Sequence, residues 1–154
     1  MAAGEAARFR ALRLAALRDA PDAFGTTLAE AEALSDAEWG AALMRSATFV
    51  ASRDGRDCGL LRGWPGSDGA GTARLISFWV APDARGRGVG LALVERLVVW
   101  ARGEGVRRLL LDVTDENAGA IALYARAGFR PTGRKGALPP PRAHILEHEM
   151  ARDL

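Results

Sequence analysis

The stretch that most constrains this chain runs from Leu75 to Gly90, LISFWVAPDARGRGVG. It begins as an apolar strand, stops at Ala81-Pro82-Asp83, and passes through alternating arginines and glycines into an amphipathic helix. The first backbone N–H groups of a helix lack intrahelical partners, and the helix dipole favours negative charge beside them. A buried strand that leads through a glycine-rich turn into a helix therefore predicts an anion-binding site.

An ordinary glycine-rich turn on a cationic surface is the alternative, because a bare G-x-G-x-G match has low specificity. No Gly-Lys-Ser/Thr follows the turn, which excludes a Walker A loop. Leu93 stands where the third glycine of the dinucleotide-binding fingerprint belongs. The turn by itself thus predicts an anion site without identifying the anion.

The length of 154 residues predicts a single domain, 1–154, with a sizeable core. The formal charge is only +2, from 21 basic and 19 acidic residues, and no basic run is interleaved with aromatic residues. We therefore expect no nucleic-acid partner. Cys58 is the only cysteine, which excludes an intramolecular disulfide and a cysteine-rich metal site. No segment resembles a membrane span or a signal peptide, so we expect a cytoplasmic protein with no membrane partner and no metal.

Apolar periodicity and turn signals predict the α/β class, with a mixed sheet and helices on both of its faces. Asp54-Gly55 predicts a hairpin turn between the first two strands. The stretch Arg134–Arg142, which contains three consecutive prolines, is expected to be a loop. Helices are expected at 9–20, 28–34, 36–45, 89–103 and 117–127, and strands at 48–52, 58–64, 73–81, 108–113, 129–133 and 145–150.

A second motif lies about thirty residues after the turn, in NAGAIALY from Asn117 to Tyr124. Seven residues separate the two polar side chains, so both lie on one face of a helix, two turns apart. An amide and a phenol that face one groove are able to bind a ligand and donate a proton to it. Taken singly, each residue has a structural alternative: Asn117 as a helix N-cap and Tyr124 as a packed core residue.

The two motifs together form the ordered pattern V-x-P-x-x-R-G-x-G-V-G, a helix, an apolar strand, and E-N-x-x-A-I-x-L-Y-x-x-x-G-F. This pattern resembles the GNAT superfamily of N-acetyltransferases, closely over Ile76–Gly133 and in outline over Phe9–Met150. The resemblance implies a GNAT-like acyl-CoA N-acyltransferase fold with a central splayed mixed sheet. The splay is expected between the strand that ends at Val80 and the strand Arg108–Val113.

The resemblance also implies that acetyl-CoA is the co-substrate and that its pyrophosphate binds the backbone N–H groups of the turn. The pantetheine arm would lie along the end of the preceding strand and bond Asn117. The residues implied in binding are Phe78, Trp79, Val80, Arg85, Gly86, Arg87, Gly88, Val89, Gly90, Leu91, Asn117, Ala120 and Tyr124.

The same resemblance implies direct attack of an amine on the thioester, without a nucleophilic side chain. The Val80 N–H would donate to the thioester carbonyl, and Tyr124 would protonate the departing thiolate. Asp112 lies five residues before Asn117, at a position where some relatives carry a catalytic glutamate. It is the candidate base; a strand aspartate paired with an arginine, and a water chain to solvent, are the alternatives.

The leading hypothesis is therefore an acetyl-CoA-dependent N-acetyltransferase that uses a ternary complex. A catalytically silent acyl-CoA-binding sensor or scaffold is the second hypothesis, and a nucleotide- or polyanion-binding protein is the third. The sequence does not identify the amine acceptor, which is a small molecule or a protein amine. Family members usually begin with a strand, and none is expected before Phe9; the unpaired sheet edge that would result favours a homodimer.

Overall fold

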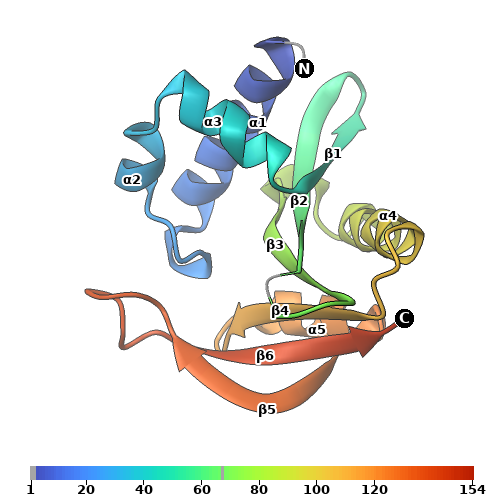
Figure 1. The fold of residues 1–154 in the computed structure, drawn as a ribbon. Helices are drawn as coiled ribbons and strands as arrows, with labels where there is room; N and C mark the ends of the chain where they lie inside the picture. Colours follow the sequence, from blue (N-terminus) through green and yellow to red (C-terminus); the bar gives the residue numbers. More distant parts are fainter. Residues whose placement is uncertain (1–2, 67) are drawn as a thin grey trace.

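In a computed structural model, which describes residues 3–66 and 68–154, the chain forms a six-stranded mixed sheet with helices on both faces (Figure 1). The helices are α1 (Ala3–Asp19), α2 (Leu28–Glu32), α3 (Asp36–Met44), α4 (Val89–Gly103) and α5 (Ala118–Arg126), with short 3-10 turns η1 (Pro21–Ala23) and η2 (Pro82–Ala84). The strands are β1 (Ala47–Arg53), β2 (Arg56–Pro65), β3 (Thr72–Val80), β4 (Arg108–Thr114), β5 (Arg130–Ala137) and β6 (Leu146–Asp153).

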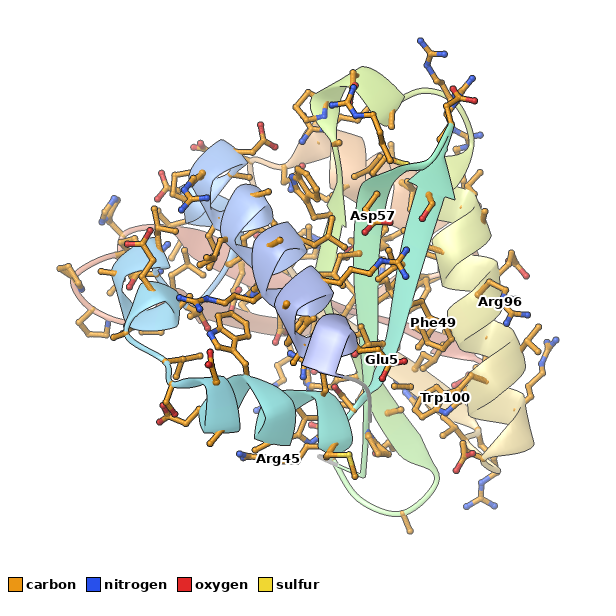
Figure 2. All side chains as sticks on the ribbon, turned by 90° about the horizontal axis from the view of Figure 1, so that it is seen from above. Glu5, Arg45, Phe49, Asp57, Arg96 and Trp100 are labelled. Carbon is orange, nitrogen blue, oxygen red and sulfur yellow. The ribbon has the colours of Figure 1, made fainter. Side chains whose placement is uncertain are left out.

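The sheet separates two apolar layers, one under α1–α3 and the other under α4 and α5. Figure 2 shows α1 and α3 on one side of the strands and α4 on the other. Successive residues of a strand point to opposite faces. Leu60 accordingly packs with α1–α3, whereas its neighbour Leu61 packs with α4. The strand order is β1-β2-β3-β4-β6-β5, in which the β3–β4 pair is parallel and the others are antiparallel. The predicted fold class is confirmed.

The predicted splay lies between β3 and β4. Only Thr72–Arg74 of β3 pairs with β4, through Arg108–Leu110, so the two strands separate beyond Arg74. A β-bulge in β3 adds to the separation. Leu60 of β2 pairs with Trp79 and Arg62 pairs with Ile76, so β3 contains one more residue than β2 between these two pairs. Ser77 in this bulge has a φ of +54°, in the left-handed region. The second half of β3 therefore presents a free edge to the interior of the molecule.

Two predicted segments at the C-terminal end were wrong in extent. Residues 134–137 belong to β5, not to a loop, and the last strand continues to Asp153 instead of ending at Met150. β5 is an edge strand whose residues are all exposed, so it has no alternation of apolar and polar residues to reveal it. A register shift between Pro131 and Lys135 further disguises the pairing.

The N-terminal helix is also longer than predicted, because α1 begins at Ala3 in the alanine-rich segment. The Asp54-Gly55 hairpin is confirmed: both residues have positive φ, +50° and +76°, as a type I′ turn requires. Nowhere in 3–66 or 68–154 is a helix both long and apolar enough to cross a bilayer.

Candidate functional site

The turn between β3 and α4 leaves open space beside backbone N–H groups. Gly86 and Gly88 have φ of +71° and +82°, and a Cβ added to either would meet no atom within 4 Å. Gly88 caps α4, and Ala92 N–H makes the first helical hydrogen bond, to the Gly88 carbonyl at 3.0 Å. The N–H groups of the first turn before Ala92 therefore have no intrahelical acceptor and are available to an anion.

Gly90 has a different role from the other two glycines. A Cβ there would lie 2.6 Å from Leu123 Cδ1 and 3.1 Å from Phe78 Cζ. The absence of a side chain at Gly90 therefore lets the start of α4 pack closely against β3 and α5.

Arg85 was predicted to contact the anion, but the structure places its guanidinium in a protein network. Its Nε donates to the Val80 carbonyl at 2.9 Å, and its Nη2 pairs with the carboxylate of Asp19. Trp79 Nε1 donates to the same carboxylate at 2.9 Å; this bond is the largest single cause of the lowered pKa of Asp19, and the Arg85 pair lowers it further. Arg85 and Trp79 thus fasten the end of β3 to the end of α1.

The backbone of Val80 points toward the splay. Ala81 N–H donates to the Cys58 carbonyl at 2.8 Å, which makes Ala81 a hydrogen-bonded partner of β2. Successive residues of a strand direct their N–H groups to opposite edges. Val80, paired with Gly59 in this register, therefore directs its N–H away from β2, as a donor to a thioester carbonyl requires.

Two cavities of about 600 Å³ each adjoin at the splay. The first, called the turn cavity, lies against Arg85–Leu91 and the exposed face of α5. The second, called the inner cavity, extends between β3, β4 and the N-terminal helices. Both are lined by Ala23, Phe24, Phe78, Asn117 and Ala120. A molecule that follows the edge of β3 can therefore occupy both.

Most residues predicted to hold the co-substrate line the turn cavity. The two exceptions are Arg87, which is exposed, and Tyr124, which lines the inner cavity. Arg126, an exposed cation on α5, also lines the turn cavity and was missed by the sequence analysis. The helical spacing was the available signal: Arg126 lies three residues after Leu123 and four after Ala122, which line the same cavity, so the three share a helix face.

Tyr124 is only 5% exposed, and its ring contacts those of Phe78 and Phe129 at centroid distances of 5.7 and 5.9 Å. Its hydroxyl makes no hydrogen bond with any residue that the structure describes. Burial raises the pKa of Tyr124 well above its ordinary value. Asn117 Oδ1 accepts from Ala120 N–H at 3.2 Å, so this residue caps α5 while also lining both cavities. Tyr124 and Asn117 thus have the structural roles that their alternative interpretations expected, and both also line the inner cavity at the splay.

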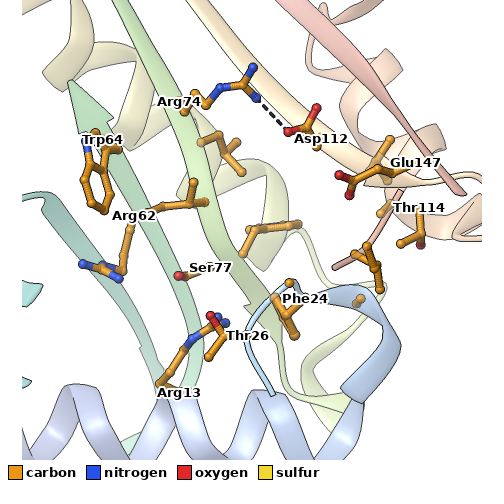
Figure 3. A pocket seen from close by; sticks show the side chains of 18 of the residues that line it. Arg13, Phe24, Thr26, Arg62, Trp64, Arg74, Ser77, Asp112, Thr114 and Glu147 are labelled. Atoms are coloured by element: carbon orange, nitrogen blue, oxygen red, sulfur yellow. Dashed lines mark hydrogen bonds and ion pairs between the residues drawn. The ribbon is translucent and has the colours of Figure 1, made fainter. Parts of the chain in front are cut away.

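The carboxylates of the inner cavity differ in their partners (Figure 3). Asp112 accepts from Arg74 Nη1 at 2.9 Å, as the ion-pair interpretation expected, and Arg74 also binds Glu149 and Asp68. Burial nevertheless outweighs Arg74 and raises the pKa of Asp112.

Glu147 on β6 lines the same cavity and has no ion pair or hydrogen bond from its side chain within 3–66 and 68–154. Burial, and then the charge of Asp112, raise its pKa. Glu147 could not be assigned to the site from the sequence, because β6 alternates too loosely between apolar and polar residues to show which face each residue occupies.

The β5–β6 loop covers the inner cavity and is fastened by Arg142. Arg142 Nη1 donates to the Pro21 carbonyl at 2.7 Å, and Arg142 Nη2 donates to the Gly25 carbonyl at 2.9 Å. Leu138 and Pro139 from this loop and Gly25 and Thr26 from the facing loop all line the inner cavity. The two loops therefore form a common wall.

Arg142→Ala should release this wall, because both hydrogen bonds disappear. We expect roughly tenfold faster amide hydrogen exchange in both loops, with unchanged exchange in β2 and β4. Arg134→Ala is the matched control, since Arg134 lies on the same hairpin, is mostly exposed and reaches Glu149 only at 4.0 Å. Equal exchange in the two variants would show that Arg142 does not hold the loops together.

The sequence model of the acetyltransferase (GNAT) family matches residues 11–129 of the chain. The chain belongs to this family. A GCN5-related N-acetyltransferase from Kribbella flavida is similar in structure, with a TM-score of 0.71 and 30% identity over 93% of this chain and 89% of the other. A ribosomal-protein-alanine N-acetyltransferase from Brucella melitensis shares the fold with a TM-score of 0.77, at 24% identity over 100% of this chain and 97% of the other.

Curated relatives in the GNAT family match over shorter segments. The mycothiol acetyltransferase of Beutenbergia cavernae is 38% identical over 86 residues, which are 56% of this chain and 29% of the relative. The streptothricin acetyltransferase of Streptomyces lavendulae is 41% identical over 71 residues, 46% of this chain and 38% of the relative. The chain thus covers less than half the length of each of these two relatives. No three His, Cys, Asp or Glu residues of the described chain are grouped so that they could hold a metal ion.

Proposed function

We propose that this GNAT chain is an N-acetyltransferase that moves an acetyl group from acetyl-CoA directly to an amine in a ternary complex. The observation that carries the proposal is the pair of adjoining cavities at the splay. One ends at the free N–H groups before Ala92, which suit a pyrophosphate. The other contains a phenol and two carboxylates, which suit proton transfer. The named relatives act on different molecules, so family membership leaves the acceptor open.

In the proposed reaction, acetyl-CoA supplies an activated thioester, and the protein positions it and handles protons. The Val80 N–H donates to the carbonyl oxygen, which gains negative charge during attack. Tyr124 donates to the departing sulfur. The pKa of a free thiol is about 8.5, far below the raised pKa of this buried phenol, so Tyr124 shares its proton with the sulfur instead of delivering it fully.

The base in this proposal is Glu147. An amine attacks only when neutral, so its proton needs an acceptor, and a nearby carboxylate is suited to that role. Glu147 is unpaired within the described chain and has a raised pKa, which brings a carboxylate closer to the ideal for a base at neutral pH. Asp112 remains the second candidate, although its bond to Arg74 makes its carboxylate a weaker proton acceptor.

A silent acyl-CoA-binding module is the competing function, and the engagement of Asp112 by Arg74 favours it. Two measurements separate the functions. Calorimetric titration with acetyl-CoA should show binding under both, and a thiol-release assay across amine classes should show turnover only for the enzyme. Absence of acetyl-CoA binding would contradict both functions. Competition by ATP or RNA instead of CoA would identify a general polyanion site.

Gly88→Ala tests the phosphate end of the proposal. The added methyl group meets no protein atom but fills the space beside the N–H groups. We expect the Kd for acetyl-CoA to rise roughly tenfold or more, because a closely approaching phosphate loses contact with the backbone. Titration calorimetry measures this change.

Gly55→Ala is the matched control for Gly88→Ala. Its φ is +76°, against +82° for Gly88, and its Cβ likewise meets nothing within 4 Å, but it lies in the β1–β2 hairpin. Both variants carry the same left-handed strain, about 1–2 kcal/mol. If the two variants bound acetyl-CoA equally well, the turn would not be the phosphate site.

A further inference from the structure

Two buried arginines line the inner cavity without an acidic partner. Arg13 on α1 is 9% exposed and Arg62 on β2 is 7% exposed. Within the described residues neither forms an ion pair with a carboxylate. Arg13 forms no hydrogen bond there either, and its Nη1 is fully enclosed without a partner. A buried charge without a counter-ion is costly, so its presence requires an explanation.

Packing explains Arg62 but not Arg13. Arg62 Nη2 donates to the Ala42 carbonyl and to Ser46 Oγ, both at 2.6 Å, which ties β2 to the end of α3. Its guanidinium also lies over the Phe9 ring, 4.7 Å from the centroid. The only comparable contact of Arg13 among the described residues is with the Phe24 ring, at 4.5 Å. The Arg13 guanidinium is thus held in place while its donors are left unused.

The two charges also oppose each other. Burial, and then the positive charge of Arg62, lower the pKa of Arg13 to about 10. Burial and Arg45 do the same to Arg62, also to about 10. Two buried cations therefore lie together at this end of the cavity, where an anion would relieve the repulsion and satisfy the unused donors.

We propose that the acceptor is a small amine that carries an anionic group, and that the anion binds Arg13, with Arg62 supporting it through charge. Figure 3 shows Arg13 rising from α1 on one side of the cavity, with Asp112 and Glu147 on the opposite side. One end of the cavity thus suits an anion and the other an ammonium group. A volume of about 600 Å³ is in the range of small-molecule sites. This proposal rests on the proposed acetyl transfer.

Matched amines test the charge preference. Glycine, β-alanine and γ-aminobutyrate place the carboxylate at increasing distance from the amine, and their amides replace the charged carboxylate with a neutral group of nearly the same size. The wild-type kcat/KM should favour one acid over its own amide roughly 10- to 150-fold, the range for a hydrogen bond to a charged group. Aminopropylphosphonate, compared with γ-aminobutyrate, distinguishes a phosphate-like from a carboxylate anion. Equal kcat/KM for every acid and its amide would overturn the proposal.

Arg13→Met should abolish this preference by raising KM for the acid while leaving the amide and acetyl-CoA unaffected. Arg10→Met is the control on the same helix, because Arg10 is half-exposed, pairs with Asp36 at 3.7 Å and does not line the cavity. That control should retain the wild-type preference. Should Arg13→Met fail to fold, Arg13→Lys replaces it, since a lysine keeps the charge but loses the planar fork.

Thermal unfolding provides a readout that does not depend on turnover. If the role of Arg13 is to bind an anion, Arg13→Met removes a buried charge that is unpaired in the free protein and should therefore raise its Tm. The preferred acid should raise the Tm of the wild type but not of Arg13→Met. A lowered Tm for Arg13→Met, with no ligand-induced rise in the wild type, would make Arg13 a structural residue. A ligand-induced rise without transfer to any amine would contradict the proposed function while supporting the anion site.

Discussion

Tyr124→Phe is expected to lower kcat for acetyl transfer about 10²- to 10³-fold, the usual loss for one hydrogen-bond donor in a reacting site. The hydroxyl has no partner among the described residues, and the ring alone makes the contacts with Phe78 and Phe129. Removing the oxygen should therefore leave Tm unchanged or slightly raised. Steady-state thiol release and a thermal melt measure the two quantities.

Binding of acetyl-CoA separates two explanations of such a loss. An unchanged Kd with a reduced kcat places the effect on the chemical step. A Kd that rises in proportion to the loss of activity would show that Tyr124 only binds the co-substrate. An unchanged kcat would exclude its role at the leaving sulfur.

Glu147→Gln is expected to lower kcat/KM at neutral pH about 10²- to 10⁴-fold, because the amide cannot accept the proton of the amine. The pH profile gives the sharper evidence. A base acts in its deprotonated form, and burial raises the pKa of Glu147 above the ordinary 4.5. Wild-type activity should therefore rise as pH increases through this raised pKa, and the variant should lack that limb.

Stability should change in the opposite direction in Glu147→Gln. A carboxyl group whose pKa is raised in the folded state favours its protonated form there, so its contribution to stability is lost as pH rises through the folded pKa. The uncharged glutamine should therefore make the protein slightly more stable than the wild type at neutral pH. A lower Tm would indicate that Glu147 holds the fold.

Asp112→Asn is the comparison that decides between the two carboxylates. Among the described residues, Arg74 has three acidic partners, Asp68, Asp112 and Glu149, and two of them remain in this variant. We expect less than a tenfold loss of kcat/KM and a retained acidic limb. A larger loss than that of Glu147→Gln would identify Asp112 as the base.

The parts of the site that follow from local chain geometry could be predicted from the sequence. The strand, the glycine turn and the start of α4 are contiguous in the sequence, so the position of Gly86 and Gly88 at the N-terminus of α4 could be predicted. Asn117 and Tyr124 share a helix face by spacing alone. The splay required the family resemblance, because which neighbouring strands separate depends on a bulge at Ser77 that leaves no apolar pattern.

The acceptor side could not be predicted, because its residues come from distant segments. Arg13, Arg62 and Glu147 lie on α1, β2 and β6, and each looks like an ordinary polar residue within its own element. Arg85 makes the same point: a cation beside glycines predicts a phosphate contact, and only the tertiary structure adds Asp19 and the Val80 carbonyl as its partners. In both cases long-range neighbours determined the role.

The link between Arg85 and Asp19 has a consequence for acceptor length. Asp19 ends α1 beside the strand that would carry the thioester, and Arg13 lies six residues earlier on the same helix. Six residues span about 9 Å along a helix axis. If Arg13 holds the acceptor's anion, α1 fixes the distance between that anion and the end of β3, because Asp19 at the end of α1 is bonded to Trp79 and Arg85. Moving Arg13 by one helical turn would then select a longer or shorter acceptor without altering the catalytic groups.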